Sequence, residues 1–246
     1  MVTCRLEGKK SIRFNLGESI FFILLISLAM FILIGSPLFE IRQITVEGNE
    51  FFTGRKIVAV SGIELNTNIF KVNLAQATDR LKTMPMLKEA HITRDLPSRV
   101  LIRVIERKPV AFLPSAGGFI LVDAEGVYCR EGKIGEAGLP VITGPFVRIP
   151  PAGQVIKDPG FQVALKVLNS LSGELIGDLS EIHVDRRKEV ILYTLEGIQC
   201  RLGPPEDLVH KGSALVQVLD RLKGKKIEYV DLSIVGFPVV KYKGEG

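Results

Sequence analysis

The sequence predicts an α+β protein that is held to a membrane by one N-terminal helix. Three observations lead to this prediction. The run from Ser19 to Phe39 has no charged side chain, residues 40–108 show the order strand, helix, helix, strand, strand, and residues 109–246 combine many short strands with two helices. A small sheet covered by two helices, followed by a larger β-rich unit, accommodates these patterns.

The uncharged run is long enough for one membrane crossing. At about 1.5 Å per helical residue it spans roughly 30 Å, the thickness of a bilayer's hydrocarbon core, and it is expected to be helical throughout. Pro37 should mark its outer end. The alternatives are a buried core helix and a cleaved signal peptide. The length of the run disfavours the first, and the lack of a proline-free cleavage site around Gly35 disfavours the second.

The flanking charges predict the orientation of this segment. Four basic residues precede the run, whereas the residues that follow it most closely are mainly acidic. Lys and Arg accumulate on the cytoplasmic side of membrane helices. Residues 1–18 are therefore expected in the cytoplasm, residues 19–39 in the membrane and the remaining chain outside the cytoplasm.

Charge and cysteine usage limit the function classes. The formal net charge of +5 is small, and both signs are mixed along the chain, so a nucleic-acid footprint is not expected. The three cysteines, Cys4, Cys129 and Cys200, have no metal-site spacing. Cys129 and Cys200, which follow the membrane segment, could form a disulfide, but nothing in the sequence brings them together. Two reduced, buried thiols on strands are the favoured interpretation.

Two short helices are predicted after a first strand over residues 41–46. Thr53 can cap a helix over residues 54–61, and Gly62 supplies its stop. Asn73 stands three residues before Gln76, a variant of the capping box, and the second helix should end at Met84-Pro85. Strands over residues 87–94 and 99–106 complete this unit.

The remaining chain predicts a β-rich unit with two amphipathic helices. Asp158-Pro159 begins the first helix and Pro204-Pro205-Glu206 the second, whose basic residues, Lys211 among them, should lie outside or near its end. The predicted strands span 119–122, 127–130, 181–185, 190–195, 198–202, 227–234 and 239–242.

Several motifs, in this order behind one membrane segment, resemble the FtsQ/DivIB family of bacterial cell-division proteins. They are Ile44–Asn49 and Val104–Ala111, then Leu121–Val127, Leu139–Gly144 and Tyr229–Leu232. The first two resemble the family's POTRA domain, expected over residues 40–108. The other three resemble its second, β domain, expected over residues 109–246.

No constellation for chemistry is recognisable. The histidines His91, His183 and His210 stand at neither metal nor nucleophile spacing, and there is no nucleophile elbow or phosphate loop. His91 and His183 are expected on solvated strand faces. We therefore predict no enzyme, no catalytic residue, no metal, no cofactor and no small-molecule substrate.

The C-terminal strands are the predicted docking site for proteins. A terminal strand offers unpaired backbone groups to a partner's extended segment, and Pro238 favours an edge position. In the family that this chain resembles, FtsB- and FtsL-like partners dock there, and Ile234 and Tyr242 would be contact residues. Ser233 stands where the family usually has arginine. The candidate contact residues are Ile234, Val235, Phe237, Val239, Val240 and Tyr242, although alternation should send either Val239 or Val240 into the core.

The POTRA-like unit has two interpretations. Its exposed strand edge could recruit further division proteins, or the unit could be a spacer. Arg42, Arg55 and Lys56 are candidate recruitment residues, and near the membrane they could also meet anionic lipid headgroups, with ordinary solvated charge as the alternative.

The resulting prediction is a non-enzymatic scaffold of the division machinery at the septum of the cytoplasmic membrane. Two alternatives remain. One is a POTRA-containing accessory of outer-membrane protein assembly, and the other is a membrane-anchored cell-wall hydrolase.

Overall fold

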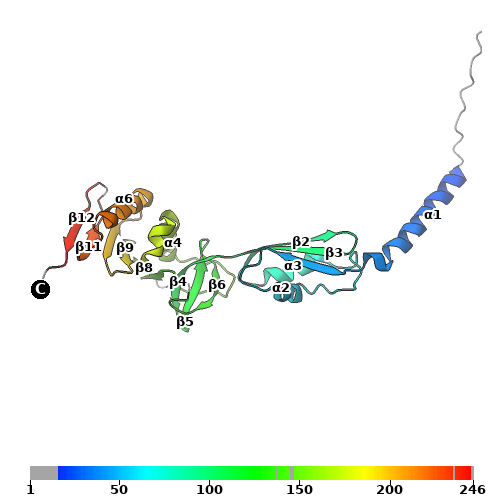
Figure 1. Ribbon diagram of the computed structural model, residues 1–246, viewed down its shortest axis with the longest axis horizontal. Helices are drawn as coiled ribbons and strands as arrows, with labels where there is room; N and C mark the ends of the chain where they lie inside the picture. Colours follow the sequence, from blue (N-terminus) through cyan, green and yellow to red (C-terminus); the bar gives the residue numbers. More distant parts are fainter. Residues whose placement is uncertain (1–15, 137, 145–146, 235, 245–246) are drawn as a thin grey trace, which may run out of the picture.

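The computed structural model describes residues 16–136, 138–144, 147–234 and 236–244. Along these residues an N-terminal helix precedes two sheets, one of three strands and one of nine. Figure 1 shows an elongated arrangement in which the helix and the last strand lie at opposite ends. The C-terminal strand is therefore the part of the described chain most distant from the apolar helix.

The apolar helix, α1 (Leu16–Ile34), has almost no contact with the rest of the protein. The stretch Gly17–Ile34 is long and apolar enough to cross a membrane, and none of it is buried. A buried core helix is thus excluded. The helix ends earlier than expected, because Ser36 is extended ahead of Pro37, as residues before proline usually are, and caps a short turn, η1 (Pro37–Phe39).

The three-stranded sheet follows directly. It has the order β1-β3-β2, with β1 (Gln43–Glu47) parallel and β2 (Leu87–Asp95) antiparallel to β3 (Arg99–Glu106). Two helices, α2 (Gly54–Ser61) and α3 (Leu74–Lys82), pack against this sheet (Figure 1). We call these five elements the proximal unit. Their order confirms the sequence prediction.

Local signals determine the helix ends of the proximal unit. Thr53 accepts a hydrogen bond from the Lys56 amide, and Asn73 accepts one from the Gln76 amide, which satisfies free N–H groups at each N-terminus. Gly62 ends α2 in the left-handed conformation. The apolar helix faces then cover the inward residues of β2 and β3, with Ile57, Ala77, Leu81, Val100, Ile102 and Val104 in the shared core.

The nine-stranded sheet begins after a two-residue link, Arg107-Lys108, that follows β3. Its order is β12-β11-β10-β9-β8-β7-β4-β5-β6. The strands are β4 (Pro109–Ser115), β5 (Gly118–Asp123), β6 (Tyr128–Gly132), β7 (Val141–Thr143), β8 (Leu179–Val184), β9 (Val190–Thr194), β10 (Gln199–Gly203), β11 (Ile227–Asp231) and β12 (Val239–Tyr242).

Two long helices supply the core of this second sheet. They are α4 (Pro159–Ser170), capped by Asp158, and α6 (Leu208–Arg221), with the short α5 (Gly173–Gly177) between them. Their apolar side chains, such as Phe161 and Leu215, pack against inward strand residues such as Leu192 and Val230. We call β4 to β12 with these helices the distal unit.

Three features of the distal unit differ from the sequence prediction. The strands β4 and β7 and the helix α5 were not predicted as separate elements. The strand predicted over 227–234 ends at Asp231, whose carboxylate accepts the Ser233 amide and turns the chain. Helix α6 begins at Leu208, after the two prolines, and Lys211 is buried in it.

Candidate functional site

The outer edge of β12 is the end of the nine-stranded sheet. On its inner side β12 pairs antiparallel with β11, placing Val239 opposite Asp231 and Val240 opposite Val230. No strand of the described chain pairs with its outer side. Figure 1 shows this edge at the far end of the molecule from α1. The backbone groups of that side are available to another chain.

Exposed apolar side chains surround this edge. Ile234, Phe237, Val239 and Tyr242 are all at least half exposed, whereas Val240 packs against the distal core. The structure thus resolves the alternation: Val239 points outward and Val240 inward. The predicted contact residue Val235 lies outside the described residues. We call the edge of β12 with the four exposed side chains the terminal edge.

A row of cationic and aromatic side chains crosses the strands beside the terminal edge. The guanidinium of Arg201 in β10 lies 4.3 Å from the ring centre of Tyr229 in β11, and Lys241 Nζ in β12 lies 5.7 Å from the same ring. Lys241 also binds Glu228 at 2.9 Å. Such contacts hold the cations in fixed positions. These residues were not among the contact residues predicted from the sequence, because their proximity depends on the order of β10, β11 and β12 in the sheet.

Ser233 lies in the turn that follows β11. Its amide donates to the Asp231 carboxylate at 2.9 Å, and its Cβ lies 2.9 Å from the position a Cβ would take at Gly203. The side chain is therefore packed against the end of β10. The family that the sequence resembles usually has arginine at this position. Because serine has no charge, Ser233 cannot make a charged contact with a partner protein.

The structure separates the predicted recruitment residues of the proximal unit. Arg42 precedes β1 at the end of the sheet next to α1, where its amide bonds to the Ser98 carbonyl. Arg55 and Lys56 are in the first turn of α2, and the neighbouring Gly54 contacts Val46 near the far end of β1. Arg55 and Lys56 therefore lie at the opposite end of β1 from Arg42, and the three candidate residues do not form one surface.

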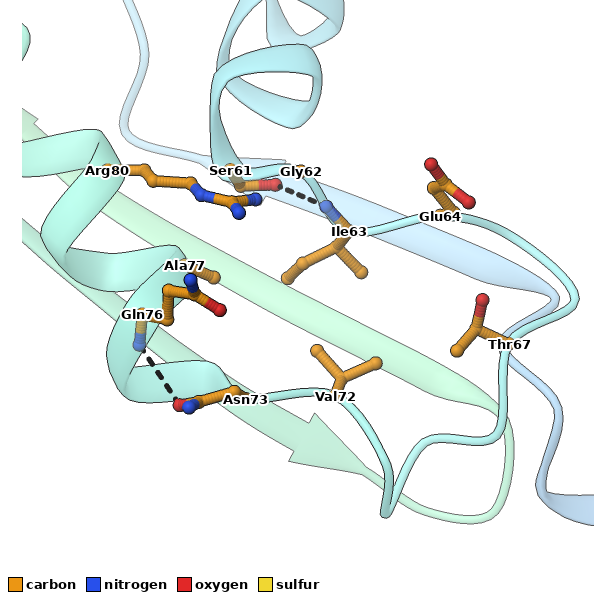
Figure 2. A pocket seen from close by; sticks show the side chains of 10 residues that line it. All are labelled: Ser61, Gly62, Ile63, Glu64, Thr67, Val72, Asn73, Gln76, Ala77 and Arg80. Carbon is orange, nitrogen blue, oxygen red and sulfur yellow. Dashed lines mark hydrogen bonds between the residues drawn. The ribbon is translucent and has the colours of Figure 1, made fainter.

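The proximal unit also has a shallow hollow of about 240 Å³ between the end of α2 and the start of α3. Figure 2 shows Arg80 of α3 reaching across it toward Ser61 and Gly62. A Cβ at Gly62 would lie only 2.0 Å from Arg80 Nη1, so the end of the Arg80 side chain occupies the space beside this glycine. The Arg80 side chain thus fills part of the hollow.

The described residues contain no cluster of three or more His, Cys, Asp or Glu that could hold a metal ion. His91 is exposed, and His183 is partly buried, with Nδ1 2.8 Å from the hydroxyl of Thr143. The residues that the structure brings together at the terminal edge are apolar, aromatic and cationic. That arrangement is suited to binding another polypeptide chain.

Comparisons with known proteins agree with the division of the chain into a proximal and a distal unit. The family model "POTRA domain, FtsQ-type" matches residues 39–107, which include the proximal unit. The model "Cell division protein FtsQ/DivIB, C-terminal" matches residues 111–233, half of the chain, and ends just before the terminal edge. The two matches thus follow each other in the order of the two sheets.

Individual relatives carry the same names. The cell division protein FtsQ of Syntrophotalea carbinolica is 31% identical over 216 residues, which cover 85% of this chain and 76% of the relative. DivIB of Clostridium acetobutylicum is 28% identical over 210 residues, which cover 82% of this chain and 83% of that relative. A solved structure of the DivIB extracytoplasmic domain from Geobacillus stearothermophilus is 22% identical, with a TM-score of 0.34, and covers 47% of this chain and 96% of that domain. On the family models and the curated relatives, the chain belongs to the FtsQ/DivIB family of cell-division proteins.

Proposed function

We propose that this chain is a non-enzymatic scaffold of the bacterial division machinery that holds partner proteins at the septum through its terminal edge. The observation that supports this proposal is the unpaired outer side of β12, flanked by exposed apolar side chains. A partner strand that pairs there gains main-chain hydrogen bonds, and alternate side chains provide selectivity.

The chemistry of the terminal edge defines the partner segment. It should be an extended segment with apolar side chains that cover Ile234, Phe237 and Val239. An acidic side chain in the segment would meet Lys241 of β12, whose Nζ lies 5.7 Å from the centre of the Tyr229 ring. Following the family resemblance, FtsB- and FtsL-like proteins are the proposed partners. The proximal unit would recruit further division proteins.

The position of α1 supports a single-pass arrangement. We assign residues 1–18 to the cytoplasm, the uncharged part of α1 from Ser19 onward to the membrane and both units to the outside, because the basic residues precede the uncharged run. A membrane-impermeant maleimide should then label a Gly117→Cys variant in intact spheroplasts, since Gly117 is in an open turn. Cys4 should react only after permeabilisation. The reverse pattern would contradict the orientation.

The docking surface can be tested with one charged substitution. Phe237→Glu places a carboxylate among the apolar side chains of the terminal edge and should reduce co-purification of the FtsB- and FtsL-like partners at least tenfold, which corresponds to about 1.4 kcal/mol. Val209→Glu is the matched control, because Val209 is also exposed and apolar but belongs to the first turn of α6. It should bind the partners normally.

Two results would contradict the proposal. If Phe237→Glu and Ile234→Glu both retained partner binding, the interface would lie elsewhere. A fluorescent fusion of the full chain that spreads evenly around the cell would oppose a role at the septum. Depletion in the host should produce filaments without lysis, whereas lysis would favour a role in the envelope.

A further inference from the structure

Four exposed apolar side chains gather at the end of the proximal unit that faces α1. They come from three separate segments and are each between 41% and 53% exposed: Leu38, Leu65, Phe70 and Leu96. Leu38 follows α1, Leu65 and Phe70 belong to the loop between α2 and α3, and Leu96 is in the turn between β2 and β3. We call these four residues the juxtamembrane face.

Hydrogen bonds attach this face to the end of α1. The side-chain amide of Asn68 donates to the carbonyl of Ile34, the last residue of the apolar span, at 2.7 Å. The amide of Ile69 donates to the Phe39 carbonyl at 2.8 Å, and the rings of Phe39 and Phe70 lie 5.1 Å apart. The loop that carries Phe70 therefore contacts the end of the membrane-spanning helix and the short turn that follows it.

Two further contacts give the face a fixed shape. Arg94 in β2 donates to the carbonyls of Ile69 and Val72, both at 2.8 Å, which holds the loop against the sheet. The Ser98 carbonyl accepts the Arg42 amide at 2.8 Å, which brings the turn with Leu96 to the same end of the unit. The four apolar side chains are thus carried by an ordered frame.

The charges at this end nearly cancel, with a small excess of cations. Arg42, Lys71 and Arg94 are exposed and have no ion pair within the described chain, while Glu40 and Glu64 lie nearby in sequence. Asp95 binds Arg99 at 2.9 Å. Attraction to anionic lipid is consequently offset by the carboxylates, and apolar contact is the larger effect.

We propose that the juxtamembrane face is seated in the headgroup region of the lipid bilayer, so that the proximal unit contacts the membrane through a surface of its own in addition to α1. The inference rests on the proposed role of α1 as a membrane anchor. Protein segments that lie in the membrane interface bury Phe and Leu side chains at the boundary between headgroups and acyl chains. With two attachments, the helix and the face, the direction in which the two units project from the membrane is fixed.

The absence of tryptophan from the sequence permits a direct test. Phe70→Trp and Phe51→Trp are introduced separately into the full chain, which is reconstituted into vesicles of phosphatidylethanolamine and phosphatidylglycerol carrying a spin label near the headgroup. The two sites are matched: Phe51 is also exposed and contacts a second ring, Phe52, at 5.0 Å, but it lies at the other end of the unit. Phe70→Trp fluorescence should be quenched at least threefold more strongly.

Equal quenching of the two variants would overturn the proposal. Leu96→Trp provides a second reporter if Phe70→Trp fails to fold, and it should be quenched like Phe70→Trp. Replacing phosphatidylglycerol with phosphatidylcholine should leave the quenching unchanged, and its loss would overturn the apolar seating. These fluorescence measurements require neither partner proteins nor a septum. If the protein gathers at the septum but Phe70→Trp and Phe51→Trp are quenched equally, only the proposed membrane contact is contradicted.

Discussion

The guanidinium of Arg107 donates a hydrogen bond of 2.6 Å to the carboxylate of Asp123, and this contact joins the two units of the protein. Their side chains are only 14% and 6% exposed. Arg107 also binds Glu125, which in turn binds Lys88 of β2. Since Arg107 and Lys108 are all that separates β3 from β4, the junction is both short and cross-linked by charge.

Removing Arg107 should destabilise the junction. Arg107→Met leaves Asp123 buried without its cation, and loss of one partner from a buried ion pair costs about 3 kcal/mol. The matched control is Arg103→Met, because Arg103 binds Glu47 at 2.9 Å with both side chains more than half exposed. That change should cost less than about 1 kcal/mol. Urea unfolding of the full chain in detergent measures both, and equal effects would contradict a special role for Arg107.

The junction should also depend on pH. Hydrogen bonds from Lys88 and then Arg107 lower the pKa of Glu125 below its usual value of 4.5. A lowered pKa means that the stabilisation is complete above pH 4.5 and is lost as the pH falls through the folded-state pKa. Glu125→Gln should therefore lose less stability than the unaltered protein as the pH falls below 4.5. If the melting temperatures of Glu125→Gln and the unaltered protein fell equally with decreasing pH, Glu125 would not contribute to the stability of the junction.

The glycine in the motif Leu139–Gly144 has a specific steric role. Gly144 has φ +94°, and a Cβ there would lie 2.0 Å from the Val184 carbonyl oxygen. Gly144→Ala should cost about 1 kcal/mol for the backbone conformation and about 1–3 kcal/mol more for the overlap. Gly197→Ala isolates the first effect, since Gly197 has φ +78° with nothing within 4 Å. Equal melting temperatures of the two variants would contradict the overlap.

The comparison of sequence and structure shows which features local patterns can predict. Thr53 and Gly62 mark both ends of α2 correctly, because capping and left-handed glycine depend on adjacent residues alone. The position of Lys211 depends instead on how the chain folds back between β10 and α6. It was expected near the helix end or outside, yet only 4% of it is exposed, because its Nζ reaches the carbonyls of Leu202 and Pro204 at 2.7 and 3.0 Å.

The buried Lys211 provides a further test of the packing in the distal unit. Lys211→Met should destabilise the protein by about 2 kcal/mol, because two carbonyl groups at the end of β10 lose their donor. Lys166→Met is the control: Lys166 is exposed and donates to the Pro205 carbonyl of the same segment at 3.3 Å. Lys166→Met should therefore leave the free energy of unfolding in urea nearly unchanged. If both variants behaved alike, burial of the ammonium group would not matter.

The candidate site was only partly predictable for a similar reason. The exposed residue Ile234 could be proposed from the family resemblance, and Phe237 because it directly precedes Pro238 between the last two strand patterns. The row formed by Arg201, Tyr229 and Lys241 could not, since it requires the order β10-β11-β12, in which β10 and β11 are parallel and separated by α6. Strand neighbours of this kind are set by tertiary packing.

The two outer cysteines should stay reduced and unreactive in the folded protein. Cys129 on β6 and Cys200 on β10 are buried and free, as the sequence favoured, and burial raises the pKa of each thiol to about 12. Their strands are six positions apart in the sheet, roughly 29 Å at about 4.8 Å per step, too far for a disulfide.

At pH 8 a thiol of pKa 12 is ionised in about one molecule in ten thousand, so a maleimide or disulfide reagent should label neither cysteine within minutes. In guanidinium chloride both should react at the rate of the Gly117→Cys control, because unfolding removes the burial that raised the pKa. Mass spectrometry of the labelled full chain provides the measurement. A peptide with Cys129 linked to Cys200 after mild oxidation would contradict the strand order, because no bridge can form across the intervening strands without unfolding the sheet.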